Sequence, residues 1–375
     1  MIPKIDAHIV LEDGTIFRGK SIFFEGEKDG EIVFNTSMTG YQEIMTDPSY
    51  KGQIVVMTYP HIGNYGVNDE DIESFSPKIE GFIVRELSRI TSNQRAKESL
   101  LDYCKRNNVF LIEEVDTRAL TKHIRVRGAM KGVISTIDSD PESLLEKAKN
   151  ARGVLGVDLV REVTCDRPYL WENGKRREIN EPERNRTKPL CVVIDFGVKL
   201  NILRLLEESE FQVFVVPSFF TAERILELRP NGILLSNGPG DPAALGYVVR
   251  EIRRLIGKVP IFGICLGHQL LGLAFGGRTY KLKFGHRGAN QPIKDLSSGR
   301  VFIASENHGF AVDLSSLEDN RVKVTHINLN DMTIEGLKHE VHPIFSVQFH
   351  PEASPGPHDL YGLFKKFRDL VEEYA

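Results

Sequence analysis

From about residue 190 onward, the chain alternates short apolar runs with amphipathic stretches, and this alternation restricts its fold more than any other feature. The apolar runs are LCVVIDF, FQVFVVP, GILLSN and VPIFGI, and the stretches that follow them are KLNILRLLEESE, TAERILELR, ALGYVVREIRRLIG and HQLLGLAFG. A strand that is apolar along its whole length suits a parallel sheet covered on both faces. Strand–helix alternation with short connections therefore predicts right-handed βαβ units in a doubly wound, mostly parallel sheet.

The last part of the chain indicates additions to this sheet. After about residue 281, we expect antiparallel strands at VFIASENHGFAV, VKVTHIN, MTIEGLKH and IFSVQF. The final stretch, DLYGLFKKFRDLVEEY, predicts an amphipathic helix, because its large apolar residues recur at helical spacing. The predicted buried face consists of Leu360, Leu363, Phe364, Phe367 and Leu370.

The first half is of a different kind. Residues 8–85 contain short β-like runs broken by turn signals, namely HIVLEDG, TIFRG, SIFFEG, EIVFNTS and QIVVMTYP. Helical patterns follow at residues 98–108, 117–128 and 141–153. We therefore predict a mixed α/β N-terminal domain over 1–165. Residues 166–189 are dense in charge and proline, which is typical of a linker, and residues 190–375 form the doubly wound domain.

Composition excludes several classes of protein. The length of 375 residues suits two domains or three, and the formal net charge of −4 does not predict nucleic-acid binding. No apolar run is long enough for a membrane helix, and the N-terminal residues lack a signal-peptide core, so we expect a cytoplasmic protein. The four cysteines are scattered without a CxxC pair. This argues against a zinc site or a disulfide framework, and we predict no metal on this chain.

The segment Gly263-Ile264-Cys265-Leu266-Gly267 lies where a predicted strand meets a predicted helix. A nucleophile at such a turn is lifted above the sheet, and small neighbours allow the strained backbone. The helix N-terminus favours a thiolate and offers backbone N–H groups to an oxyanion. A buried structural cysteine is the plainer interpretation, and for this residue the two interpretations are about equally supported until a partner is found.

A partner follows the predicted strand IFSVQF, in the segment Gln348-Phe349-His350-Pro351-Glu352. Sites in open α/β sheets lie beyond the carboxyl ends of the strands, so His350 and Cys265 are expected at the same edge. An imidazole can take the thiol proton and return it to a leaving amine, and Glu352 can fix its tautomer. The residues therefore predict a Cys-His-Glu triad, although His350 alone fits a structural strand-end histidine.

Three further segments are candidates with weaker signals. The loop SNGPGDP at residues 236–242 can bring backbone close to a substrate, but it also fits an ordinary turn. The segment SENHGF at 305–310 can hold a substrate's polar end, whereas its histidine more often has a structural role. In the first half, FNTSMTGYQEIMTDPSY at 34–50 fits a functional or interface loop and a packed turn equally well.

Taken together, these residues resemble a known family. FGICLGHQLL, SNGPGDP and HPE occur in this order and are similar to the motifs of class I (triad) glutamine amidotransferases, over roughly residues 190–375. FNTSMTGYQEI, TDPSY, YPHIGNYG, IDFGVKLNILR, NHGFAVD and HPEASPGPHD extend the resemblance to the small, glutamine-hydrolysing subunit of carbamoyl phosphate synthetase, over essentially the whole chain. One departure is Phe349, where many relatives carry a small residue, and we expect it to alter packing behind His350.

The resemblance implies individual roles. Cys265 attacks the glutamine carboxamide and forms a thioester, His350 moves the proton, and Glu352 orients His350. Gly238 and Leu266 bind the carbonyl region, and Lys199 lines the cleft. The expected glutamine-binding residues, one of them (Ser49) reaching in from the first domain, are Ser49, Gly238, Gly240, Leu266, Gln269, Asn307, Gly309 and Phe310.

The resemblance also implies a partner. Ammonia passes to a separate large synthetase subunit, which makes carbamoyl phosphate from bicarbonate and ATP. ATP and magnesium are expected on that subunit, and no cofactor on this chain, which carries no phosphate-cradling GxxxxGK[ST] loop. The N-terminal domain is expected to face the partner. Whether the product feeds arginine synthesis, pyrimidine synthesis or both is left open.

Other interpretations remain at this stage. The chain could serve another synthetase, such as one that makes anthranilate or GMP, although the long first domain argues against this. It could be a free-standing cysteine hydrolase or peptidase, which would be fully active without a partner. A catalytically idle scaffold is a third alternative, and the complete set Cys265, His350 and Glu352 argues against it.

Overall fold

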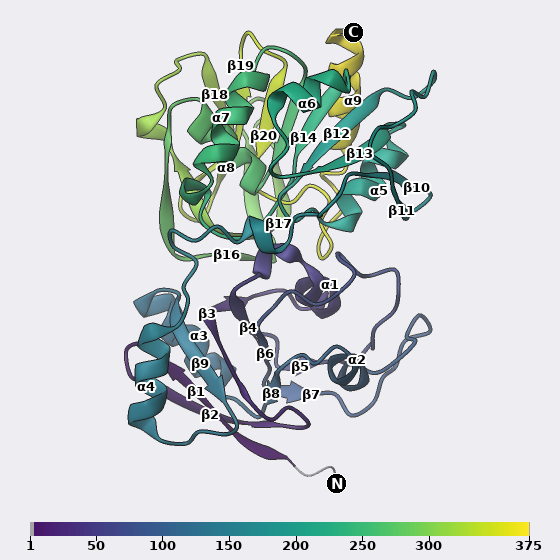
Figure 1. Ribbon diagram of the computed structural model, residues 1–375. Helices are drawn as coiled ribbons and strands as arrows, with labels where there is room; N and C mark the ends of the chain where they lie inside the picture. The colour runs from purple at the N-terminus through teal and green to yellow at the C-terminus, as the bar shows by residue number, and fades with distance from the viewer. Residues whose placement is uncertain (1–3, 375) are drawn as a thin grey trace. The chain divides into compact units, whose positions relative to one another are not determined.

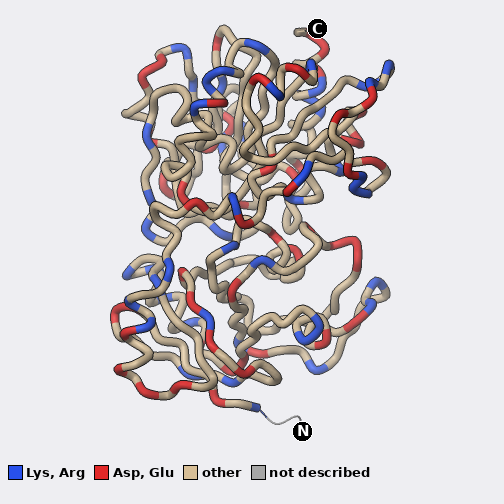
Figure 2. Tube along the Cα trace, in the orientation of Figure 1, with Lys and Arg blue, Asp and Glu red and all other residues tan. Residues whose placement is uncertain are grey.

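The computed structural model describes residues 4–374. Contacts divide the chain into two units, Met1–Val157 with Lys283–Gly288, and Asp158–Leu282 with Ala289–Ala375. Figure 2 shows Lys and Arg interspersed with Asp and Glu along both units. No helix among residues 4–374 is both long enough and apolar enough to cross a membrane.

The first unit is built around a closed barrel (Figure 1). In barrel order its strands are β1 (Ile5–Leu11), β2 (Ile16–Ser21), β8 (Leu111–Glu113), β6 (Gly81–Ile83), β4 (Gln53–Met57), β3 (Glu27–Asn35) and β9 (Met130–Ser135). The barrel closes because β9 pairs antiparallel with both β1 and β3. Its interior is filled by aliphatic side chains, including Ile32, Ile54, Val56, Ile83 and Ile134.

Helices and short strands surround this barrel. They are α1 (Tyr41–Thr46), α2 (Leu100–Arg106), α3 (Thr117–Arg127), α4 (Pro141–Asn150) and the pair β5 (His61–Ile62) and β7 (Glu86–Leu87). The three helices predicted in this half are confirmed. The strand predicted at SIFFEG is wrong, because residues 22–26 form bends between β2 and β3, where the Ser21 hydroxyl accepts a hydrogen bond from the backbone N–H of Phe24.

The second unit contains a single mixed sheet whose centre is parallel, which confirms the predicted doubly wound architecture. The parallel strands, in spatial order, are β13 (Gln212–Pro217), β12 (Leu190–Asp195), β14 (Gly232–Leu235), β15 (Ile261–Ile264) and β20 (Ile344–Val347). The helices are α5 (Leu200–Glu208), α6 (Ala222–Glu227), α7 (Gly246–Leu255), α8 (Leu266–Ala274) and α9 (Gly362–Tyr374).

Both faces of this sheet are buried, as the uniformly apolar strands predicted. On β15, Ile261 belongs to the core that includes residues of α7 and α8. The next residue, Phe262, points to the other face, stacks on Phe345 at 4.4 Å between ring centroids and packs against Phe364 and Phe367 of α9. In α9 the buried residues are Phe364, Phe367 and Val371, while the predicted Leu363 and Leu370 are only half-buried.

Antiparallel strands extend both ends of the sheet. One end carries β19 (Ile334–His339), β18 (Val322–Asn328), β16 (Arg278–Asp295) and β17 (Val301–Asp313). The strand at IFSVQF is antiparallel to β19 as expected, but it also pairs parallel with β15 and so belongs to the central sheet.

At the other end, residues 166–189 contain more than the predicted linker. β10 (Tyr169–Glu172) and β11 (Lys175–Glu178) form a hairpin whose first strand pairs antiparallel with β13. Tyr169, Leu170 and Trp171 are buried there, because the apolar side chains of this otherwise charged segment complete the edge of the sheet.

Candidate active site

Cys265 occupies a strained turn between β15 and α8. Its backbone has φ 52° and ψ −102°, in the half of conformational space that residues with a Cβ avoid. The neighbouring strand β20 holds Cys265 in this turn, because the Cys265 backbone N–H donates to the Val347 carbonyl at 2.8 Å. The thiol therefore lies at the carboxyl edge of the parallel sheet, directly before the N-terminus of α8, as the sequence predicted.

The glycines on either side make this turn possible. A Cβ on Gly267 would lie 2.2 Å from the carbonyl oxygen of Leu235, so α8 could not approach β14 with any larger residue. A Cβ on Gly263 would lie 2.9 Å from the Gly267 carbonyl oxygen. Both glycines are therefore required by close backbone approach rather than by flexibility.

His350 is brought to the same edge by the strand next to β15. Its backbone N–H donates to the Ser305 carbonyl at 2.8 Å, and its side chain is almost fully buried. Among residues 4–374, the Nε2 atom has no hydrogen-bond partner, although Cys265 is near enough to raise the pKa of His350. An imidazole nitrogen that faces the thiol without a bond to protein suits a site in which the substrate completes the contacts.

Glu352 fixes the other side of the imidazole and is itself paired with a cation. The Nδ1 atom of His350 lies 2.6 Å from Glu352 Oε1, and Lys199 Nζ lies 3.0 Å from the same oxygen. Lys199 also donates to the Ala353 carbonyl, and Asn201 donates to the Glu352 carbonyl at 2.7 Å. The loop after β12 and the segment after β20 therefore meet at this carboxylate.

These contacts decide the charges of the site. Burial alone would lower the pKa of His350, but the nearby Glu352 and Cys265 outweigh it and raise that pKa to about 10. Burial alone would raise the pKa of Glu352, but Lys199 and His350 lower it to about 2. At neutral pH the pair is therefore an imidazolium and a carboxylate. That is the state in which His350 can donate a proton to a leaving amine.

The loop after β14 lies beside the start of α8. A Cβ on Gly238 would be 2.2 Å from the Phe196 carbonyl oxygen and 2.9 Å from a side-chain carbon of Leu266, so only glycine fits. Gly240 has φ +88°, and the Gly267 N–H donates to the Ser236 carbonyl at 3.0 Å. The structure thus brings Gly238 and Leu266 together beside Cys265, where backbone N–H groups could be tested as an oxyanion hole.

A buried amide network borders the thiol on its other side. Gln269 Nε2 donates to the Phe310 carbonyl at 2.8 Å and to Gln348 Oε1 at 3.0 Å. The Asn307 carbonyl lies 3.7 Å from the Cys265 sulfur. The predicted residues Gln269, Asn307 and Phe310 therefore gather around Cys265, and half-buried Gly309 lies between the last two in sequence.

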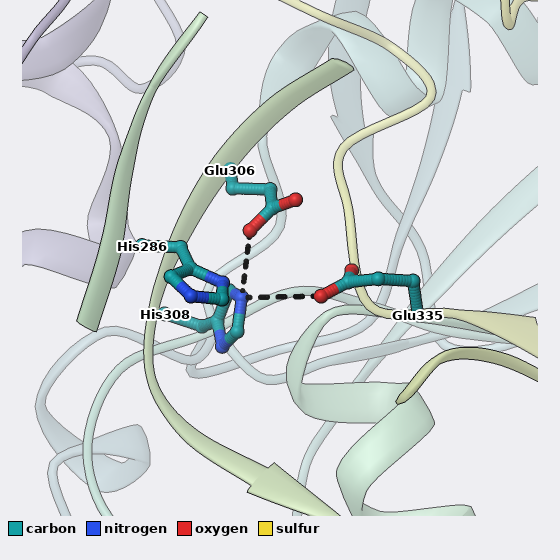
Figure 3. Close-up of side chains that lie close together, drawn as sticks. All are labelled: His286, Glu306, His308 and Glu335. Atoms are coloured by element: carbon teal, nitrogen blue, oxygen red, sulfur yellow. Dashed lines mark hydrogen bonds and ion pairs between the residues drawn. The ribbon is translucent and has the colours of Figure 1, made fainter. Parts of the chain in front are cut away.

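His308, which the sequence suggested as a structural histidine, has buried carboxylates on one side (Figure 3). Its Nε2 atom lies 3.0 Å from Glu306 Oε2 and 4.0 Å from Glu335 Oε1. Its Nδ1 lies 2.8 Å from the Phe310 carbonyl, which can only accept. Burial and then the neighbouring Glu306 raise the pKa of Glu335 well above its ordinary value.

Ser49 belongs to the first unit, where it lies in the single turn Pro48–Tyr50 and is buried. Its backbone N–H donates to Asp47 Oδ1 at 2.9 Å. Next to it, the phenol of Tyr50 accepts a hydrogen bond at 2.7 Å from the amide of Asn35. The motif at residues 34–50 therefore comprises the end of β3, helix α1 and this buried turn. The role of Ser49 in binding glutamine stays a prediction.

Sequence reasoning underrated two residues. Lys199 was expected at most to line the cleft, whereas it contacts Glu352; a lysine directly after an apolar strand end was the available signal. Gln348 was noted only as the start of the His350 segment, whereas its amide nitrogen lies 3.6 Å from the Cys265 sulfur. Phe349 packs behind the histidine segment as expected, with its ring 5.5 Å from that of His326.

The chain is similar to known proteins over nearly its whole length. The family model described as "Carbamoyl-phosphate synthase small chain, CPSase domain" matches residues 9–134, and that of "Glutamine amidotransferase class-I" matches 192–370. A carbamoyl phosphate synthase small chain from Syntrophotalea carbinolica is 56% identical over 98% of both chains. One from Aquifex aeolicus is 55% identical over 98% of this chain and 99% of its own. A solved glutamine amidotransferase from Thermotoga maritima covers 50% of this chain and 85% of its own, at 19% identity and a TM-score of 0.37.

Proposed function

The chain belongs to the family of carbamoyl phosphate synthase small chains, and from this premise we propose that Cys265, His350 and Glu352 carry out its glutamine hydrolysis. The function of the chain is to hydrolyse glutamine to glutamate and ammonia and to deliver the ammonia for carbamoyl phosphate synthesis. The observation that carries the residue assignment is the strained Cys265 turn, which lies beside a buried His350–Glu352 pair on the neighbouring parallel strand.

In the first step, the Cys265 sulfur attacks the carboxamide carbon of glutamine. The carbonyl oxygen becomes an oxyanion, which we place near the backbone N–H groups of Leu266 and Gly238. His350 donates a proton to the amide nitrogen, the C–N bond breaks, and ammonia leaves. The product of this step is a γ-glutamyl thioester on Cys265.

In the second step, water attacks the thioester carbon. His350, now neutral, takes a proton from the water, the C–S bond breaks, and glutamate leaves while the thiolate is restored. The carboxylate of Glu352 stabilises the imidazolium in both steps and holds its orientation. Lys199 keeps Glu352 ionised in this buried place, which is the reason we include it in the machinery.

The amino-acid end of glutamine needs polar groups beyond the reacting carbon. We assign it to the residues around the buried amide network and the adjoining glycine loop, which are Gly240, Gln269, Asn307, Gly309 and Phe310. In Gln269 both amide hydrogens have acceptors, the Phe310 carbonyl and Gln348 Oε1, so the group it can offer a ligand is its own Oε1, an acceptor. An acceptor at this place suits the α-ammonium group of an amino acid.

We further propose that the ammonia is consumed by a separate large subunit. The relatives are named small chains of a synthase, which is the support for a larger partner. ATP, magnesium and bicarbonate would be bound by that partner, and this chain would supply only nitrogen.

Ammonia release from glutamine, measured for the purified chain with and without the large subunit, tests this function. Weak release alone, rising strongly with the partner, ATP and bicarbonate, is the expected result. Equally fast release by the isolated chain would instead indicate a free-standing hydrolase. No release under either condition would contradict the function itself.

A further inference from the structure

Gln348 is fully buried directly after β20, two residues before His350. Its backbone N–H donates to the Glu335 carbonyl of β19 at 2.9 Å, so the residue is fixed between two strands. A buried amide must place both its oxygen and its nitrogen, because a polar atom without a partner is costly inside a protein. The partners of Gln348 therefore reveal its orientation.

The orientation follows from one acceptor that cannot be reversed. The Phe310 carbonyl can only accept, so the Gln269 atom 2.8 Å from it is the amide nitrogen. That same nitrogen lies 3.0 Å from the Gln348 side chain, which must present its oxygen. The nitrogen of Gln348 is consequently turned the other way, toward the Cys265 sulfur at 3.6 Å.

We propose that Gln348 is a further catalytic residue, whose amide N–H donates a hydrogen bond to the Cys265 sulfur and stabilises the thiolate. The inference rests on the proposed function, since it assigns a role in the same thiol chemistry. Hydrogen bonds to a charged acceptor are the strong ones, and burial strengthens them further. A thiolate accepts such a bond better than a thioester sulfur does.

This role differs from that of His350. The imidazole exchanges a proton with the reacting atoms, whereas an amide neither gains nor loses one at any accessible pH. Gln348 thus favours the thiolate in two situations, before attack and when the sulfur leaves the thioester. No bond to Gln348 forms or breaks, and no proton is transferred from it.

A purely structural role is the alternative, in which Gln348 serves only to hold Gln269. The two roles separate in the alkylation of the thiol by iodoacetamide, because this reaction needs the thiolate and no bound glutamine. The rate is measured against pH on the full chain, and the Cys265 peptide is followed by mass spectrometry so that the other cysteines do not interfere.

For Gln348→Met, which keeps the side-chain length but has no N–H donor, we expect the pH of half-maximal alkylation to rise by about one unit. At pH values well below that midpoint, this corresponds to an alkylation rate about tenfold below that of the parent. In the glutaminase reaction of the complex, turnover should fall while KM changes little. The matched control Gln269→Met, whose amide does not contact the sulfur, should change the alkylation profile less and instead raise KM.

Identical alkylation profiles for Gln348→Met and the parent would overturn the proposal. If Gln348→Met fails to unfold cooperatively on heating, Gln348→Leu replaces it, because that side chain also has no N–H donor for the sulfur. An unchanged profile in that variant would overturn the proposal equally. Failure of the proposed function would appear elsewhere, as a parent chain that alkylates normally but releases no ammonia from glutamine.

Discussion

Two buried carboxylates in the second unit, Glu352 and Glu335, have pKa values shifted in opposite directions, although each has a histidine close by. Glu352 lies between His350 and Lys199, and these two cations lower its pKa to about 2. Glu335 lies beside Glu306, with His308 at 4.0 Å, and burial together with the second carboxylate raises its pKa. Burial is almost complete in both cases, so burial alone does not decide ionisation.

The comparison teaches that the number of neighbouring charges decides which site can do acid–base chemistry. At Glu352 two cations face one anion, so the carboxylate stays ionised and the imidazole holds its proton. At Glu335 a second carboxylate, Glu306, lies beside the first, and burial with this like charge favours the protonated form of a carboxyl there. Only the first arrangement gives a histidine with an anion behind it and a thiol in front of it.

The largest effect should come from removing the proton carrier of the first region. His350→Asn should lower glutamine turnover by about two to four orders of magnitude, since the acid–base step is lost. His268→Asn is the matched control, because burial and then His308 and His326 lower the pKa of His268 to about 3, so it is neutral at pH 7. Steady-state ammonia release measures both variants, and a loss below tenfold in His350→Asn would indicate a different base.

A second effect should appear in stability. Glu352→Gln leaves Lys199 buried without its counter-charge, which should lower the free energy of unfolding by about 3–5 kcal/mol at neutral pH. Denaturant unfolding measures this loss. Lys199→Met removes the other partner of the same ion pair and is the complementary variant. Equal stability of Glu352→Gln and the parent would show that the ion pair contributes nothing to folding.

The lowered pKa of Glu352 also predicts how the free energy of unfolding changes at acid pH. Because the pKa of Glu352 is about 2 in the folded chain, below its ordinary value of 4.5, its stabilisation is complete above pH 4.5. It should disappear as pH falls from there toward 2, at a cost of about 3 kcal/mol. Unfolding free energies measured across this range should therefore converge for the parent and Glu352→Gln, and curves that stay parallel would contradict the assignment.

The smallest effect should come from the second region. Glu335→Gln replaces a carboxyl that favours its neutral form, so it should change the free energy of unfolding by less than about 1 kcal/mol near pH 5. The raised pKa stabilises the fold at low pH, and this contribution is lost as pH rises. The variant should therefore become more stable than the parent at higher pH. A loss as large as that of Glu352→Gln would remove the contrast between the two regions.

The parts of the molecule that could be predicted are those set by local sequence. The apolar runs at β12 and β15 identified a parallel sheet, and the glycines around Cys265 identified the turn, because both depend on neighbours in the chain. The common edge of Cys265 and His350 was also predicted, although IFSVQF was expected among the antiparallel strands, and the parallel pairing of β15 with β20 is what brings the two residues together.

What could not be predicted depends on residues far apart in the sequence. The first-unit barrel closes through pairing of β1 with β9, which no local pattern specifies. The contact of Lys199 with Glu352 joins two separate loops, and the orientation of Gln348 depends on Gln269 and the Phe310 carbonyl. The hairpin in the segment predicted as a linker was missed because its buried apolar residues are few among many charges.

The assignment of Cys265 as the nucleophile for glutamine is tested most directly by trapping the covalent intermediate. The chain is mixed with glutamine and quenched in acid during turnover, and its peptides are analysed by mass spectrometry. The account predicts a γ-glutamyl adduct on the peptide that contains Cys265, and none in the Cys265→Ala variant. Glutamine hydrolysis with no adduct on Cys265, or with an adduct on another residue, would contradict it.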